Sequence, residues 1–315
     1  MRNAVVLVTD EAIFPAAMFA AHRLAALKNR DDTDIIVFTD ANRQLPAANA
    51  MHLPFQLAPM IYPQGVRLPP EYYRLFLPNF LGKHYRRILY VDVDTYAENS
   101  GLYALFDLDM RGRLIGAVRD WLVAFGARQS ELDATLGGRH AKYLNSGVLL
   151  IDCEAYVARE ALLGLLEIVR VGAAQSIYRD QSALNTFLRG DWLELSPAFN
   201  MFIAGWNSPL SRICEPVITH FAGQKKPWHG PHFRSDHPAR AEMERFFPAS
   251  PWKGFLPRFF NVRDAIDLGT EGKPDGMDWA FKANSPFVRY LRETEFADVT
   301  AGLTTLHLEH LPGGC

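Results

Sequence analysis

The chain has 315 residues, of which 49% are hydrophobic and 22% are charged, and its formal net charge at pH 7 is −2. This length can bury a sizeable core, and it suits either one large α/β domain with an extension or two domains. The near-neutral charge gives no electrostatic basis for nucleic acid as a partner. The three cysteines, Cys153, Cys214 and Cys315, form neither a disulfide framework nor a paired metal motif. They indicate a reducing compartment, with Cys153 and Cys214 in the core.

The charge around residues 12–21 bears on localisation. These residues are apolar enough to resemble the core of a signal peptide, but Asp10 and Glu11 precede them, where a signal peptide carries positive charge. We therefore expect a core helix at this place and a cytoplasmic protein. No segment approaches the ~18–20 apolar residues of a membrane span.

Strands and helices are expected to alternate as far as residue 221. Short apolar runs predict strands, and longer Ala- and Leu-rich runs predict helices. In chain order we expect a strand at 4–9, a helix at 14–28, strands at 35–39 and 51–57, a helix at 71–81 that Pro78 kinks or ends, a strand ending at Asp92, a strand at 113–120, a loop feeding a strand at 143–152, helices at 154–172 and 179–189, and a strand at 216–221. This alternation predicts an α/β fold with a mostly parallel sheet flanked by helices.

The composition changes after about residue 230. From there to residue 315 the chain is rich in histidine, proline and aromatic residues and shows little strand periodicity. We predict one domain over residues 1–230, followed by a C-terminal extension over 231–315 that either packs on the domain or lies at an interface.

Two aspartates, Asp92 and Asp94, follow the apolar run 88–91. Ionised carboxylates are costly to desolvate, and side chains two apart on a strand project to the same side. We therefore expect both to converge at the carboxyl end of the strand, where open α/β sheets bind ligands. Three interpretations are open: surface-turn carboxylates, the nucleophile loop of a haloacid-dehalogenase-like phosphatase, or a clamp that holds a divalent ion on a diphosphate.

The phosphatase interpretation agrees with less of the sequence. Such a loop carries Thr or Val two positions after the second aspartate, where this chain has Tyr96. It also normally opens the domain and needs a downstream acidic pair at another strand end, which the sequence does not show.

Segment 218–229 favours the metal clamp. His220 ends an apolar strand, Gly223 gives the backbone freedom, and Lys225 and Lys226 follow. This loop combines an imidazole donor for a metal with an ammonium group for phosphate oxygens. An imidazole together with two carboxylates suits Mn²⁺ at least as well as Mg²⁺.

Two further polar sets interrupt apolar segments. Asn145, Ser146 and Gly147 precede a buried strand, as a turn does, and Asp180 and Gln181 begin a helix. Asp180 is a suitable N-cap, whereas a cap does not explain Gln181. Each set alone fits a structural role or a binding site.

These motifs together resemble the retaining glycosyltransferases of family 8, the group that includes bacterial lipopolysaccharide galactosyl- and glucosyltransferases and glycogenin. The resemblance extends from about residue 3 to 229. Its most specific pieces are "LYVDVD", "LNSGVLLID", "RDQSALN" and "HFAGQKKPWH", in the family's order.

The resemblance implies a GT-A fold, in which a Rossmann-like mixed sheet is flanked by helices. It also implies a UDP-sugar donor, Mn²⁺ with Mg²⁺ as the alternative, transfer of a hexose such as galactose or glucose, and a saccharide or lipid-linked acceptor. Asp92, Asp94 and His220 match the family's metal ligands. The positions that match its donor-binding residues are Asp10, Arg74, Asp92, Val93, Asp94, Asp120, Asn145, Ser146, His220, Gly223 and Lys226. The catalytic positions match Gln181, placed under the sugar, and Asp180, placed at the sugar hydroxyls.

The sequence departs from the family pattern near Asp10, which matches the aspartate that binds the uracil. The family usually continues with Asn-Tyr, whose tyrosine stacks on the base, whereas this chain has Ala12 and Ile13. Phe14 is the alternative stacking residue if the loop shifts by one position.

The segment 251–263, "PWKGFLPRFFNVR", holds three basic residues, four aromatics and no acid. One interpretation is an ordinary segment packed on the domain. The other is an interfacial segment that brings the protein to the inner membrane face, with Trp252, Phe255, Phe259 and Phe260 in the headgroup region and Lys253, Arg258 and Arg263 on anionic lipid.

The resulting hypothesis is a metal-dependent retaining hexosyltransferase. Two other classes are open: the phosphatase that uses Asp92 and Asp94, and a catalytically silent sugar-nucleotide-binding protein.

Overall fold

The computed structural model describes residues 1–39, 52–59, 68–125, 142–171, 178–206, 208–223, 226–229, 237–256 and 280–311. No helix within these ranges is long and apolar enough to cross a membrane. Cys153 and Cys214 are free and buried, as predicted.

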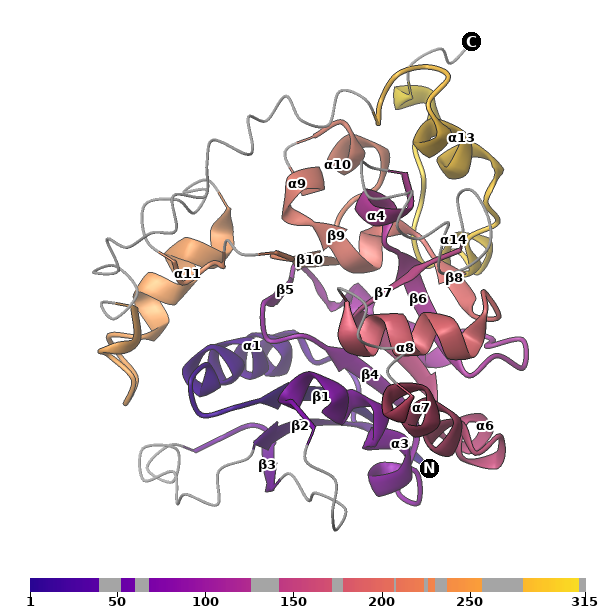
Figure 1. The fold of residues 1–315 in the computed structure, drawn as a ribbon. Coiled ribbons are helices and arrows are strands. Elements are labelled where there is room, and N and C mark those ends of the chain that lie inside the picture. The colour runs from indigo at the N-terminus through magenta and orange to yellow at the C-terminus, as the bar shows by residue number, and fades with distance from the viewer. Residues whose placement is uncertain are drawn as a thin grey trace.

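A seven-stranded sheet in the order β3-β2-β1-β4-β7-β6-β8 forms the centre of the molecule (Figure 1). Its strands are β1 (Arg2–Thr9), β2 (Thr33–Thr39), β3 (Gln56–Pro59), β4 (Tyr85–Val91), β6 (Ile115–Arg119), β7 (Leu144–Asp152) and β8 (Leu193–Leu195). β7 runs antiparallel to β4 and β6, and the other pairs are parallel. The predicted mostly parallel α/β sheet is confirmed, with one reversed strand.

A second, three-stranded sheet joins β5 (Thr95–Ala97), β10 (Ile218–His220) and β9 (Met201–Phe202). The segment predicted as the last strand of the main sheet therefore pairs elsewhere. In this small sheet His220 is the register partner of Thr95 on β5 and of Phe202 on β9. Because β5 follows directly after Asp94, this pairing brings His220 to the end of β4.

Helices cover both faces of the main sheet. The α-helices are α1 (Phe14–Leu27), α3 (Leu77–Leu81), α4 (Trp121–Phe125), α6 (Cys153–Ala158), α7 (Ala161–Arg170), α8 (Arg179–Leu188), α9 (Ile203–Trp206), α10 (Leu210–Ile213), α11 (Pro238–Phe246), α13 (Pro286–Glu293) and α14 (Ala297–Thr300). The 3-10 helices are η1 (Pro70–Leu75), η2 (Ser100–Asp107), η3 (Pro197–Asn200) and η5 (Leu308–His310). Alternate residues of β1 serve the two cores: Val5 and Leu7 pack with α1, and Ala4 and Val6 with η1, α3, α6, α7 and α8.

Several predicted boundaries are wrong. The strand predicted at 51–57 is β3, which begins only at Gln56 and ends at Pro59. The helix predicted at 71–81 is η1 followed by α3, and Pro78 lies in the first turn of α3, where its missing N–H breaks no hydrogen bond. The helix predicted at 154–172 is split into α6 and α7 by Glu160, whose φ is 50°.

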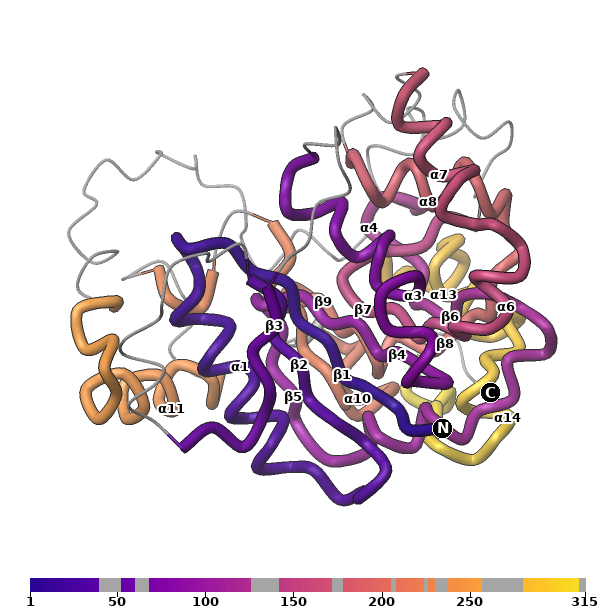
Figure 2. Tube along the Cα trace, turned by 90° about the horizontal axis from the view of Figure 1, so that it is seen from below, coloured from indigo at the N-terminus to yellow at the C-terminus, as the bar shows by residue number. Residues whose placement is uncertain are grey.

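The described part of the C-terminal region lies on two sides of the molecule (Figure 2). α11 packs beside α1, where the ring centroid of Phe19 lies 5.5 Å from that of Phe246. α13 packs beside α4, with the ring centroids of Phe287 and Trp121 5.0 Å apart. Side chains of both pieces belong to the core that contains α1. The boundary at residue 230 stays a prediction, and the described residues beyond it pack on the domain.

Candidate active site

A pocket of about 470 Å³ opens where β1 and β4 end. Six of the predicted donor-binding residues line it: Asp10, Arg74, Asp92, Val93, Asp94 and Lys226. The remaining wall consists of Val8, Thr9, Ile13, Pro70, Glu71, Tyr90, Trp228 and His229. The position at the carboxyl ends of neighbouring parallel strands is the one expected for a ligand site in such a sheet.

The three predicted metal ligands meet at the edge of this pocket. His220 Nε2 lies 3.5 Å from Asp94 Oδ1 and 3.9 Å from Asp92 Oδ2. Each residue offers one ligand atom, and these three atoms all lie within 4.8 Å of one another. β4 ends at Val91, so a turn, and not strand alternation as expected from the sequence, brings the two carboxylates together.

One carboxylate oxygen of Asp92, Oδ1, contacts two neighbouring side chains. Asp92 Oδ1 accepts a hydrogen bond from the Tyr90 hydroxyl and lies 3.0 Å from Arg74 Nη2. Arg74 also lies over the Tyr90 ring, 4.4 Å from its centroid. These contacts fix the carboxylate so that Oδ2 faces His220.

Asp94 is oriented in the same manner. Its Oδ2 is paired with Lys226 Nζ, which also donates to the Phe221 carbonyl at 3.1 Å. Its Oδ1 is therefore the oxygen that faces His220. Burial alone raises the pKa of this carboxyl, but His220 and Lys226 together hold it below its ordinary value. Asp94 is thus an ionised oxygen donor at neutral pH.

This donor set fits a divalent cation. Each of the three residues uses one polar atom on a protein partner and directs the other toward a common point, as ligands with an ordered outer shell do. Two carboxylate oxygens with one imidazole nitrogen suit Mn²⁺ at least as well as Mg²⁺.

A buried polar floor adjoins the triad. Asp120 Oδ2 accepts hydrogen bonds from the amides of Gln181 at 3.0 Å and Asn145 at 3.1 Å. Gln181 Oε1 accepts from the Ser146 backbone N–H at 3.1 Å. Burial raises the pKa of Asp120, and the two amides oppose this shift. Asn145 and Ser146 lie inside β7, not in the loop that the sequence predicts, opposite a register shift in β6.

Arg74 connects the floor to the pocket. Its Nη1 donates to the Ser146 carbonyl at 2.6 Å, and its Nε lies 3.2 Å from Asp180 Oδ2. Burial raises the pKa of Asp180 to about 6, although Arg74 opposes the shift. Among the described residues Asp180 Oδ2 is buried and receives no hydrogen bond, so the Arg74 guanidinium is its ion-pair partner. Asp180 lies within the first turn of α8 and is not its N-cap.

Gly223 and Lys226 follow β10 in the sequence. Gly223 has a φ of 94°, in the region that favours glycine, and an added Cβ would meet no atom within 4 Å. Position 223 therefore favours glycine for its backbone conformation and not for space. Lys225 lies outside the described residues.

At the end of the pocket near Asp10, Phe14 does not have the position expected of a base-stacking residue. Asp10 Oδ1 accepts from the N–H groups of Ala12 and Ile13 at 2.9 and 3.1 Å, and Ile13 lines the pocket. Phe14 begins α1, is buried, and packs edge-on against Trp252 with ring centroids 5.8 Å apart. The hypothesis that Phe14 stacks on a base is wrong, because its ring is part of the core.

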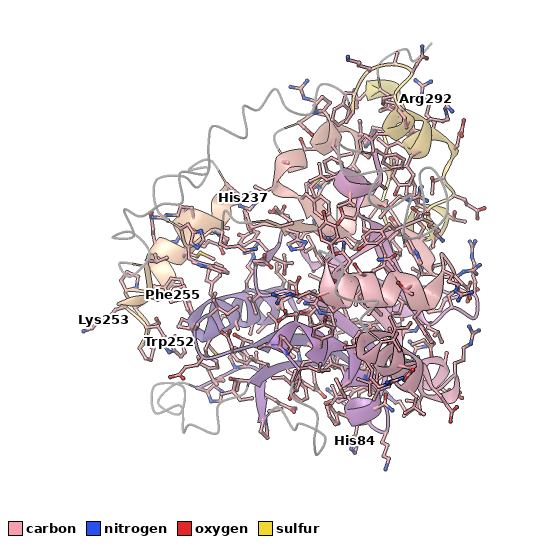
Figure 3. The ribbon with its side chains drawn as sticks, in the orientation of Figure 1. His84, His237, Trp252, Lys253, Phe255 and Arg292 are labelled. Carbon is pink, nitrogen blue, oxygen red and sulfur yellow. The ribbon has the colours of Figure 1, made fainter. Side chains whose placement is uncertain are left out.

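The aromatic residues of segment 251–256 face the protein. Trp252 stacks on Phe246 at 6.5 Å between ring centroids, and Phe255 lies 4.9 Å from Phe247. In Figure 3, Lys253 points outward from the molecule. Phe255 is buried, so the prediction that it enters a lipid headgroup region is wrong. Trp252 is half-buried, and its membrane contact stays a prediction. Residues 257–263 lie outside the described residues.

Sequence reasoning missed two polar residues of the site. The sequence predicts Tyr90 only as part of a strand, although it lies two positions before Asp92, where strand side chains share a face. Asn200 bonds to both His220 and Asn145, and its one signal is a polar residue inside the apolar run "AFNMF". Its partners are 20 and 55 residues away in sequence.

Comparisons with known proteins identify relatives of this chain. Residues 67–231, just over half of the chain, match the family model described as "Glycosyl transferase family 8". General stress protein A of Bacillus subtilis is 26% identical over 196 residues, which cover 58% of this chain and 65% of that protein. Lipopolysaccharide 1,2-glucosyltransferase of Escherichia coli is 26% identical over 197 residues, covering 59% of this chain and 56% of that protein. The matches thus span less than two thirds of these relatives.

The fold is shared with solved glycosyltransferases. The galactosyltransferase LgtC, crystallised with donor and acceptor sugar analogues, matches with a TM-score of 0.60 and 22% identity, over 82% of this chain and 97% of that one. GlyE of Streptococcus pneumoniae matches with a TM-score of 0.59 and 20% identity, over 82% of this chain and 63% of that one. The expected GT-A fold is confirmed. Because the family model covers more than half of its length, the chain belongs to glycosyl transferase family 8.

Proposed function

We propose that the protein is a Mn²⁺-dependent retaining glycosyltransferase that moves a hexose, galactose or glucose, from a UDP-sugar to a hydroxyl acceptor. The observation that supports this most strongly is the meeting of three ligand atoms, from Asp92, Asp94 and His220, at the edge of a pocket floored by buried hydrogen-bonding groups. Mg²⁺ is the alternative ion for the same oxygen-rich set.

In this proposal the pocket binds the nucleotide diphosphate and the polar floor binds the sugar. When bound, the divalent ion supplies positive charge next to the departing diphosphate. Lys226 adds a second positive charge, and Gly223 allows the turn that carries it. Asp10 at the end of β1 accepts from the uracil, and Ile13 gives that end of the pocket an apolar side.

The floor favours transfer on the same face of the sugar as the leaving group. An inverting enzyme needs a general base on the opposite face, whereas Gln181 is an amide and is no base at neutral pH. The bond between the anomeric carbon and the phosphate oxygen breaks, and a bond to the acceptor oxygen forms. The acceptor proton passes to the departing phosphate. Gln181 stabilises positive charge on the anomeric carbon through its carbonyl dipole, and Asp180 holds sugar hydroxyls.

The two other classes have less support. Family membership and the GT-A fold do not favour a haloacid-dehalogenase-like phosphatase. A catalytically silent sugar-nucleotide-binding protein uses the same pocket, and turnover of the donor distinguishes it from an enzyme.

A nucleotide-binding measurement tests the proposed donor. A ligand that binds only the native state stabilises it by about 2.7 kcal/mol at a hundredfold excess over Kd. UDP with Mn²⁺ is expected to raise the melting temperature clearly, and UDP alone to raise it much less, because the carboxylates repel an uncompensated diphosphate. Differential scanning fluorimetry with UDP, GDP, dTDP and ADP measures this. A larger shift with GDP than with UDP would show that the role given to Asp10 is wrong.

The acceptor is proposed to be a glycan or a lipid-linked saccharide, as in lipopolysaccharide biosynthesis, handled in the cytoplasm at the inner membrane face. One similar protein is named a lipopolysaccharide glucosyltransferase. Since Phe255 is buried in the domain, membrane contact is proposed for the other residues of 251–263.

Vesicle binding tests the membrane prediction. The protein is expected to pellet with anionic liposomes more than with neutral ones, and the double substitution Phe259→Ser and Phe260→Ser is expected to reduce pelleting without changing hydrolysis of the donor. Equal pelleting of the unsubstituted protein and the double variant would indicate that segment 251–263 only packs on the domain.

A further inference from the structure

The hydrogen bonds around His220 form a chain whose direction is fixed at one end. His220 Nδ1 lies 2.9 Å from Asn200 Oδ1, and Asn200 Nδ2 lies 2.9 Å from Asn145 Oδ1. Asn145 Oδ1 also lies 2.9 Å from the backbone nitrogen of Gly147. A backbone N–H only donates, so the Asn145 atom that faces Gly147 must be the carbonyl oxygen.

The other assignments follow from that one. Since Asn145 presents an oxygen, Asn200 must turn its NH₂ group toward Asn145 and its carbonyl oxygen toward His220. The Asn145 amide nitrogen then donates to Asp120 Oδ2 at 3.1 Å, which agrees with the same orientation. A carbonyl oxygen only accepts, so His220 must carry its proton on Nδ1. In the neutral imidazole, the form that binds a metal, Nε2 then carries the lone pair and faces Asp92 and Asp94.

We propose that Asn200 is a positioning residue that holds His220 in the tautomer competent to bind the metal. The inference rests on the proposed metal-dependent function and adds to it a residue outside the ligand set. Asn200 is the last residue of η3 and is fully buried. Its two hydrogen-bond partners, His220 and Asn145, are not among the residues that line the pocket. Its amide joins the metal triad to the sugar floor, because Asn145 bonds to Asp120.

The packing around the imidazole supports a fixed orientation. An added Cβ on Gly147 would lie 2.3 Å from His220 Cε1 and 2.7 Å from Nδ1, so the ring lies directly against the β7 backbone. Phe202 meets the ring at an interplanar angle of 71°. The ring is therefore packed against the β7 backbone and Phe202, and the partner of Nδ1 selects the tautomer.

Without Asn200, the position of the proton is set by the carboxylates alone. A proton on Nε2 is attracted by Asp92 and Asp94, and it occupies the lone pair that the metal needs. Partners that orient a histidine ligand typically contribute 10- to 100-fold to metal affinity. The effect depends on the acceptor that faces Nδ1, and an aspartate at position 200 keeps such an acceptor.

The test compares Mn²⁺ affinity in four proteins, measured from the electron paramagnetic resonance signal of free Mn²⁺. Asn200→Leu removes both hydrogen bonds and is expected to raise the Kd for Mn²⁺ by about 10- to 100-fold. Asn200→Asp keeps the acceptor for His220 Nδ1 and loses only the donor to Asn145 Oδ1, so it is expected to raise the Kd by a smaller factor than Asn200→Leu. Asn3→Leu is the matched control, because Asn3 is equally buried and bonds to Asp32 at the far end of β1. Melting temperatures without metal report the structural cost of each change.

The outcomes separate the inference from the proposed function. Equal affinity in Asn200→Leu and the unsubstituted protein would overturn the role of Asn200 and leave the metal site intact. Loss of affinity in Asn200→Asp as large as in Asn200→Leu would assign the effect to packing and the bond to Asn145 instead of the acceptor for Nδ1, and would also overturn it. No Mn²⁺ binding by the unsubstituted protein would overturn the proposed function and, with it, this role. If Asn200→Leu does not fold, Asn200→Ser, whose side chain has two fewer heavy atoms, takes its place.

Discussion

Replacing Asp94 with asparagine is expected to lower kcat/KM for sugar transfer at least about a hundredfold, equivalent to about 3 kcal/mol of transition-state stabilisation. Asp94 is buried, ionised and aimed by Lys226 so that Oδ1 faces His220. The neutral amide keeps the shape of the side chain but removes the charge. It also leaves Lys226 without a buried anionic partner. Removal of the divalent ion with a chelator is expected to abolish turnover, and added Mn²⁺ to restore it.

A surface variant controls for the loss of a charge. Asp31 is exposed and lies before β2, so Asp31→Asn changes the net charge by the same amount without touching the pocket. Its kcat/KM is expected to equal that of the unsubstituted protein. Activity that survives exhaustive chelation would contradict the assignment of Asp92, Asp94 and His220 as metal ligands.

Gln181→Ala is expected to lower kcat much more than it weakens UDP binding. The side chain lies in the polar floor, bonded to Asp120 and to the Ser146 N–H, and it does not line the pocket proposed for the nucleotide. Its interaction with the anomeric carbon grows as positive charge develops, so the loss falls on the transition state. Steady-state kinetics together with UDP-dependent melting shifts separate the two effects. A variant with unchanged kcat and a raised KM would assign Gln181 to binding alone.

The same residue predicts the stereochemistry. With no base in the position of Gln181, the product is expected to keep the α configuration of the donor hexose. Proton NMR of the anomeric signal measures this directly. A β-linked product from an α-linked UDP-hexose would contradict the role given to Gln181.

The elements that the sequence predicts correctly are those with strong local patterns. β1, β2, α1 and α8 are long apolar or periodic runs, and the structure places them within a few residues of the expected bounds. The aspartates after β4 could be recognised because charged residues directly after a buried strand need a partner. His220 could be recognised because a glycine- and lysine-rich turn follows it.

Other features depend on contacts between distant segments. β5, β8 and β9 have only two or three residues each, and they exist because of their partners in the sheets. Asn200 acquires its role from His220 and Asn145, which no local pattern connects to it. Phe14 and Trp252 illustrate the opposite error: the sequence suggests a nucleotide base as the partner of Phe14 and lipid as the partner of Trp252, whereas the structure packs the two rings against each other.

A screen of UDP-, GDP-, dTDP- and ADP-sugars for hydrolysis, with Mn²⁺ and with chelator, is the most direct measurement of the proposed function, because it needs no knowledge of the acceptor. We expect turnover of a UDP-hexose that depends on Mn²⁺ and disappears with chelator. Binding of UDP-sugars without any turnover would indicate the silent binding protein, and release of phosphate from simple phosphate esters would indicate the phosphatase. Either result would contradict a metal-dependent retaining glycosyltransferase.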